Sequence, residues 1–99
     1  MYKITDTISK EVWIGTEKAV INFANNRLQN KDIKWVTNWF KDLVEIGFVF
    51  VKVGNFWRPD KITNIELATK FFQRVENVEI VDIGDVIEEL KKDELILLS

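Results

Sequence analysis

The sequence predicts one small α+β domain over residues 1–99, with a mixed or antiparallel sheet and helices mainly on one face. The chain has 99 residues, close to the common size of a single domain. Alternating β-branched segments and segments of helical periodicity follow one another in the order β-β-α-α-β-β-α-β-α. Because strands come in adjacent pairs, an α+β fold is favoured over a doubly wound sheet.

The N-terminal segment predicts a β-hairpin followed by a helix. YKITDT (2–7) and EVWIG (11–15) alternate in polarity and are rich in β-branched residues. A helix is expected over 17–28, because Thr16 can cap it and apolar residues recur at helical spacing. The expected buried face comprises Val20, Phe23, Ala24 and Leu28. Asn25 and Asn26 are poor helix formers, so we expect the end of this helix to fray.

A second helix is predicted over 33–46. Asn30 or Asp32 can cap its start, and Gly47 fits the left-handed residue that follows a helix. The apolar stripe, which we expect to be buried, comprises Ile33, Val36, Trp39, Phe40 and Leu43. The opposite, polar stripe comprises Lys34, Asn38, Lys41 and Glu45, and Trp35 lies between the two stripes.

The next segment predicts a strand, a tight turn and a short returning strand. FVFVKV (48–53) is apolar on both faces apart from Lys52, which is typical of an interior strand. Gly54 and Asn55 suit a two-residue primed turn, after which residues 56–58 would return. The single proline, Pro59, has no N–H to donate, so the returning strand should end there or lie at an edge.

The last third predicts a helix, a strand and a further helix. Thr63 and Glu66 have capping-box spacing before NIELATKFFQRV (64–75). The expected buried face comprises Ile65, Ala68, Phe72 and Val75, widened by Leu67 and Phe71. VEIVDI (78–83) predicts a strand, and Asp85 with Glu88 marks a helix start before VIEELKK (86–92). ELILLS (94–99) fits a helix extension or a strand equally well.

Composition excludes several kinds of chemistry. The chain has no histidine and no cysteine, which rules out Ser-His-Asp and Cys-His catalysis, disulfides and the usual zinc and iron–sulfur sites. The four glycines are isolated, so no phosphate-binding loop is present. No pair of carboxylates stands out for acid–base work among sixteen. We therefore expect a non-enzymatic protein without a cofactor or metal.

Composition also gives an expectation about location and origin. The absence of cysteine fits the cytoplasm, and no apolar run has the length of a signal peptide or membrane span. We expect a soluble cytoplasmic protein with no membrane partner. Lys outnumbers Arg eleven to three, and Lys, Ile and Asn together make 31 of 99 residues. These amino acids use AT-rich codons, so a bacterium, phage or mobile element is the expected source.

Charge is distributed unevenly along the chain. Residues 1–74 carry twelve basic and eight acidic side chains, whereas residues 75–99 carry two basic and eight acidic ones. Two solvated faces would account for this, and the helix dipole gives Asp85 and Glu88 a local cause. Alternatively, an acidic surface could imitate a phosphate array and occupy a nucleic-acid channel of another protein. Its candidate residues are Glu79, Asp82, Asp85, Glu88 and Glu89.

Residues 33–59 locally resemble the recognition helix and wing of winged-helix DNA-binding domains. In WVTNWFKDLVEIGFVFVKVGNFWRP (35–59), a helix ending in Leu-x-x-x-Gly-hydrophobic runs directly into a hairpin. The resemblance implies that Lys34, Asn38 and Lys41 face the major groove of DNA. It also implies that Lys52, Asn55 and Arg58 contact phosphates. Only one helix precedes the recognition helix here, and several carboxylates offset the basic residues.

The aromatic residues give the preferred hypothesis. Trp and Arg are enriched in interface hot spots, although single exposed aromatics also occur without a function. Trp39 and Phe40 are expected in the core. We expect Trp35 and Trp57 to adjoin in a partner-binding patch rimmed by Lys34, Lys52 and Arg58. The sequence therefore predicts a small non-enzymatic intracellular binding protein, accessory or inhibitory, that acts by protein–protein contact. A winged-helix-like DNA-binding regulator is the alternative, and a homo-oligomer is compatible with either.

Overall fold

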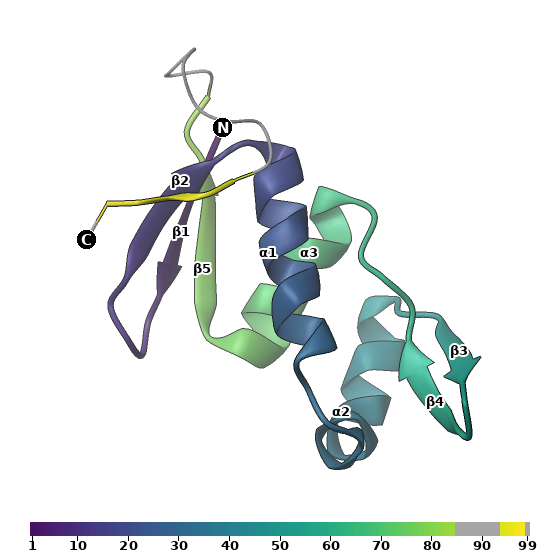
Figure 1. The fold of residues 1–99 in the computed structure, drawn as a ribbon. Coiled ribbons are helices and arrows are strands. Elements are labelled where there is room, and N and C mark those ends of the chain that lie inside the picture. The colour runs from purple at the N-terminus through teal and green to yellow at the C-terminus, as the bar shows by residue number, and fades with distance from the viewer. Residues whose placement is uncertain (85–93, 99) are drawn as a thin grey trace.

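The computed structural model describes residues 1–84 and 94–98, which form an α+β domain (Figure 1). The eight elements predicted through residue 83 occur in the predicted order. They are β1 (Tyr2–Asp6), β2 (Val12–Gly15), α1 (Glu17–Gln29), α2 (Ile33–Ile46), β3 (Phe50–Val53), β4 (Phe56–Pro59), α3 (Ile65–Phe71) with a π-helical turn (Phe72–Glu76), and β5 (Val78–Asp82). The predicted helix over 86–92 lies outside the described residues. The C-terminal tail, for which helix and strand were both open, contains β6 (Ile96–Leu97).

The larger sheet has the strand order β5-β1-β2-β6, and every pairing in it is antiparallel. Ile4 at the centre of β1 lies opposite Trp13 on one side and Ile80 on the other. Helices α1 and α3 cover one face of this sheet (Figure 1). This arrangement confirms the expected antiparallel sheet with helices on one face.

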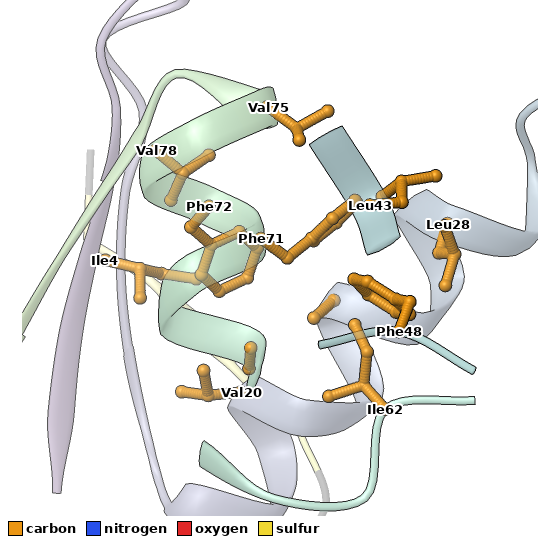
Figure 2. Packing of buried hydrophobic residues seen from close by; sticks show 12 residues of the cluster. Ile4, Val20, Leu28, Leu43, Phe48, Ile62, Phe71, Phe72, Val75 and Val78 are labelled. Carbon is orange, nitrogen blue, oxygen red and sulfur yellow. The ribbon is translucent and has the colours of Figure 1, made fainter. Parts of the chain in front are cut away.

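The core lies between the sheet and these helices. Figure 2 shows Phe71 and Phe72 of α3 and its π-helical turn between Ile4 of β1 and Leu43 of α2. Both phenylalanine side chains are fully buried. Because burying a large apolar side chain contributes about 1.5–3 kcal/mol, this cluster is the main source of stability.

The ends of α1 and α2 follow the sequence predictions. Thr16 Oγ1 accepts a hydrogen bond from the Ala19 amide at 3.2 Å, and Asp32 Oδ1 accepts one from the Trp35 amide at 2.8 Å. Gly47 has φ +113°, which is the left-handed conformation that favours glycine after a helix. The predicted fraying of α1 is wrong, because this helix continues to Gln29. Asn25 is held in place by two hydrogen bonds to the backbone of Ile62.

The start of α3 differs from the prediction. Asn64, rather than Thr63, is the N-cap, and its Oδ1 accepts a hydrogen bond from the Leu67 amide at 2.8 Å. Both residues have capping side chains, so sequence alone did not separate adjacent positions. The helix also widens into a π-helical turn before Asn77, which adopts a left-handed conformation with φ +53°.

Buried Asp6 fixes the turn of the first hairpin and pairs with the half-buried Arg27 of α1. Asp6 is buried and accepts hydrogen bonds from the backbone amides of Ile8 and Ser9 and from Arg27 Nη2, the last at 2.7 Å. Burial disfavours the charged carboxylate, but the hydrogen bonds from Arg27, Ser9 and Ile8 outweigh this effect and lower the pKa of Asp6. Asp6 is therefore ionised in the folded protein at neutral pH.

Strands β3 and β4 form a separate two-stranded hairpin. Gly54 has φ +60° at the first turn position, which fits the predicted two-residue turn. The prediction that 48–53 is an interior strand is wrong. Phe48 is buried and Phe50 is half-buried, but Val49, Val51 and Val53 are exposed. Val51 and Val53 are exposed although they are apolar, so an apolar pattern on both faces of a strand does not require that both faces be covered.

The hairpin and α2 lie at the end of the molecule opposite the larger sheet, with α1 and α3 between them (Figure 1). The described chain measures 43 × 24 × 20 Å along its principal axes. Within the described residues, no helix is long and apolar enough to cross a membrane.

Candidate functional site

Exposed apolar side chains concentrate on α2, on the hairpin and on the three-residue segment between them. Among the described residues, eight of the thirteen large exposed apolar side chains lie there. They are Ile33, Phe40, Val44, Val49, Val51, Val53, Phe56 and Trp57. Scattered single residues of this kind need no explanation, whereas eight of them at one end of a small domain are an unusual concentration.

A groove of about 700 Å³ lies between α2 and the hairpin. We call it the α2–hairpin groove. Its lining residues are Ile33, Val36, Thr37, Phe40, Phe50, Asn55, Phe56 and Trp57. Six of these eight residues are apolar and none is charged. The volume is in the range of about 300–1,000 Å³ that is usual for small-molecule sites.

The width of the apolar surface on α2 explains one wall of the groove. Successive residues are rotated by about 100° around a helix, so the apolar side chains from Trp35 round to Val44 cover about half of the circumference. Leu43 on this surface is buried in the core, whereas Ile33 and Phe40 line the groove. The Phe40 and Phe50 rings, with centroids 4.6 Å apart, join α2 to β3. One amphipathic helix therefore contributes to both the core and the groove.

Polar contacts outside the groove hold the hairpin in position. Arg58 Nη2 donates a hydrogen bond at 2.9 Å to the backbone oxygen of Lys31, just before α2. Downstream of β4, Asn25 Nδ2 donates to the Ile62 oxygen at 2.8 Å, and the Ile62 amide donates to Asn25 Oδ1 at 2.7 Å. These bonds tie the C-terminal end of β4 and the segment after it to other elements, and they position the hairpin beside α2.

The rim of the groove is basic. Thr37 lies on the groove, and Lys34 and Lys41 stand three residues before it and four after it, so they flank it on the same side of α2. Lys52 lies opposite Trp57 on the hairpin. These three lysines are exposed and form no ion pair with any described residue.

The two carboxylates of α2 form ion pairs within the domain. Arg74 forms ion pairs with Glu45 and Asp42, at 2.5 and 2.9 Å. Its hydrogen bonds to Glu45 and Asp42 raise the pKa of Arg74, which stays charged. Because Asp42 and Glu45 are both paired with Arg74, they neutralise less of the positive charge of the lysines at the groove than the sequence suggested.

The structure separates the two tryptophans that were expected to adjoin. Trp57 lines the groove and is 58% exposed. Trp35 does not line the groove; it is half-buried against Trp39, with ring centroids 6.1 Å apart, and Lys31 Nζ lies 5.1 Å from its ring centre. Trp35 and Trp57 therefore do not share the groove: Ile33 lines it together with Trp57, and Trp35 projects about 160° away from Ile33 around α2.

The other predicted contact residues are divided among several places. Asn55 lines the groove, and Lys34 and Lys52 stand on its rim. Arg58 supports the hairpin through its bond to Lys31. Lys34, Asn38 and Lys41, the candidates for the major groove of DNA, share one exposed side of α2.

The candidate acidic surface is described only in part. Glu79 and Asp82 are exposed on β5, and their odd spacing places them on opposite faces of the sheet. Asp85, Glu88 and Glu89 lie outside the described residues. In the described part of the chain, no group of three or more acidic side chains could hold a metal ion.

Sequence reasoning missed six of the eight groove residues because it assigned them to the core or did not name them as contact residues. Ile33, Val36 and Phe40 were placed in the buried stripe, Phe50 was placed in an interior strand, and Thr37 and Phe56 were not among the candidate contact residues. Two signals could have identified them. The apolar surface of α2 is wider than one-sided packing requires, and FVFVKV is apolar on both faces although only a short strand returns beside it.

No protein-family model, no curated protein and no solved structure matches the chain.

Proposed function

We propose that the protein binds another protein through the α2–hairpin groove and acts as a non-enzymatic accessory or inhibitory protein. The observation that carries this proposal is the concentration of exposed apolar side chains around an uncharged groove. Taking roughly 150–250 Å² per aromatic side chain, the four exposed apolar residues that line the groove, Ile33, Phe40, Phe56 and Trp57, present about 400 Å². This is the size of the largest apolar patch on a typical monomer, roughly 300–600 Å², and such a patch is often functional.

The arrangement also has the anatomy of a protein interface. Interfaces have an apolar centre rich in aromatic residues and a polar or charged rim. Here Phe56, Trp57 and Phe40 stand at the centre, and Lys34, Lys41 and Lys52 stand at the rim. Burial of the centre supplies affinity, and the rim sets orientation and association rate.

A second candidate function is binding to DNA through the polar side of α2. The observation that favours it is that Lys34, Asn38 and Lys41 are exposed together. A DNA shift assay over a salt series tests this candidate. Affinity that falls steeply with salt and is lost in the Lys34→Glu, Lys41→Glu double variant would support DNA binding. No shift at low salt would exclude it.

Photo-crosslinking tests the proposed protein contact. A benzoyl-phenylalanine placed at Phe56 should give a defined adduct with one partner in cells that express the protein. The matched control is Ile8, which is also an exposed apolar residue but lies in the turn between β1 and β2. The adduct should be absent at Ile8 and weakened by Trp57→Ala. Equal adducts at both positions, or none at Phe56, would refute the proposal.

A further inference from the structure

Resting on the proposed function of the α2–hairpin groove, we infer that its occupant is an amphipathic α-helix of a partner protein with acidic residues beside its apolar face. Three features of the groove lead to this inference: the chemistry of its walls, the charge of its rim and its length.

The walls favour a helix over an extended segment. Thr37 Oγ1 already donates a hydrogen bond to the Ile33 oxygen at 2.8 Å, which leaves Asn55 as the one other polar side chain in the lining. An extended peptide would bury backbone N–H and C=O groups against apolar side chains, which is unfavourable. A helix satisfies these groups internally and presents only side chains to the groove.

The strand beside the groove is also a poor site for strand addition. Strand β4 is the hairpin strand that lies next to α2 (Figure 1). It ends in Pro59, which has no N–H to donate, so a further strand could not form a complete ladder along it. This disfavours recognition of an extended peptide through backbone hydrogen bonds.

The rim favours acidic residues in the partner. Lys34, Lys41 and Lys52 are exposed around the groove and have no acidic partner among the described residues. A neutral or basic helix would leave three like charges next to a desolvated interface, whereas glutamate or aspartate at the flanks of the helix would pair with them. The positive charge of the rim therefore favours a helix with acidic flanks over an apolar helix that has neutral or basic flanks.

The length of the groove defines the apolar repeat of the partner. The lining residues of α2 run from Ile33 to Phe40, which is two helical turns, or about 10 Å at 1.5 Å per residue. A helix lying along this wall would place side chains at i, i+3 or i+4, and i+7 in the groove. The partner helix should thus carry three large apolar residues at that spacing.

Designed peptides test the inference with defined ligands. We would compare a 16-residue helical peptide that has leucine at i, i+4 and i+7 and glutamate at the flanks with two matched controls. One control replaces each glutamate by lysine, and the other places two prolines in the interior. Titrations would use fluorescence anisotropy of labelled peptide, and amide chemical shifts would locate the contact.

The acidic peptide should bind about tenfold tighter than its basic twin at low salt, because two or three exposed ion pairs form, and this ratio should shrink as salt is added. The proline peptide should not bind. Shifts should include Thr37 and Asn55 and spare Glu79 on β5. The Lys34→Glu, Lys41→Glu double variant should reverse the preference and bind the basic peptide more tightly.

Several results would overturn the inference. These are equal binding of the acidic and basic peptides, binding of the proline peptide, shifts outside the groove, or no binding of the acidic peptide. Preferential binding to phosphatidylglycerol vesicles would point to a membrane surface, and self-association that is lost in Trp57→Ala would point to a second copy of this chain. If a partner is crosslinked at Phe56 but the peptides give one of the contradicting results, the acidic helix is rejected as the occupant, and the proposed protein contact through the groove still stands.

Discussion

Asn25 connects α1 to the segment that follows the hairpin. Substituting its side chain tests whether these hydrogen bonds keep that segment in place. Its side-chain amide makes two hydrogen bonds with the backbone of Ile62, at 2.7 and 2.8 Å. Ile62 itself is only 1% exposed, so its N–H and C=O have little access to water. Asn25→Ala removes both partners at once.

The expected loss of stability follows from these two bonds. An unsatisfied buried polar group costs about 1–3 kcal/mol, and entry of water would reduce this cost. Alanine is a better helix former than asparagine, which offsets roughly 0.5 kcal/mol of the lost free energy of unfolding. We expect Asn25→Ala to lower the free energy of unfolding by about 2–3 kcal/mol, out of the ~5–15 kcal/mol that is usual for a domain.

The adjacent residue provides a matched control. Asn26 is on the same helix, but its side chain is exposed and makes no hydrogen bond with any described residue. Asn26→Ala should therefore change the free energy of unfolding by less than about 0.5 kcal/mol. Urea unfolding followed by tryptophan fluorescence measures both variants. Equal midpoints for the two variants would show that the bonds to Ile62 do not hold this part of the fold.

Three further predictions concern the core, the first hairpin and the end of α2. Phe48→Ala should lower the free energy of unfolding by about 3–5 kcal/mol and Phe40→Ala by clearly less, because Phe48 is buried and Phe40 is 49% exposed; similar losses in urea unfolding would contradict this. The wild type should lose stability as pH falls from 3.8, the ordinary pKa of aspartate, through the lowered pKa of Asp6, because the ionised carboxylate stabilises the fold. Asp6→Asn should be less stable than the wild type at pH 7 and should lose less stability in acid. Parallel curves of unfolding free energy against pH for the two proteins would refute this. Gly47→Ala should destabilise by about 1 kcal/mol, since φ is +113° there, and an unchanged thermal midpoint would argue against the strained end of α2.

The local patterns in the sequence were sufficient for most of the fold. Caps at Thr16 and Asp32 and the left-handed Gly47 fixed the start of α1 and both ends of α2, and these signals act within one helical turn. Alternation in the N-terminal hairpin likewise predicted β1 and β2. Such signals succeed because the residues that decide the structure are neighbours in the chain.

The candidate site was harder to predict because it depends on contacts between distant residues. Periodicity showed that Phe40 belongs to an apolar surface, but it could not show whether that surface meets the core or solvent. Trp35 and Trp57 were expected to adjoin in one patch. Their separation follows from the position of the hairpin on α2. That position depends on the hydrogen bond from Arg58 to Lys31 and on the hydrogen bonds between Asn25 and Ile62. Neither contact has a local sequence signature.

The affinity of the partner captured at Phe56, measured for the wild type, Trp57→Ala and Val81→Ala, tests whether the α2–hairpin groove is the binding site. We expect Trp57→Ala to weaken binding at least about thirtyfold, as for a hot-spot tryptophan of roughly 2 kcal/mol or more. Val81→Ala removes an equally exposed apolar side chain on β5, outside the groove, and should bind as the wild type does. Equal affinities for all three proteins, or a loss in Val81→Ala alone, would contradict the assignment of the α2–hairpin groove as the binding site.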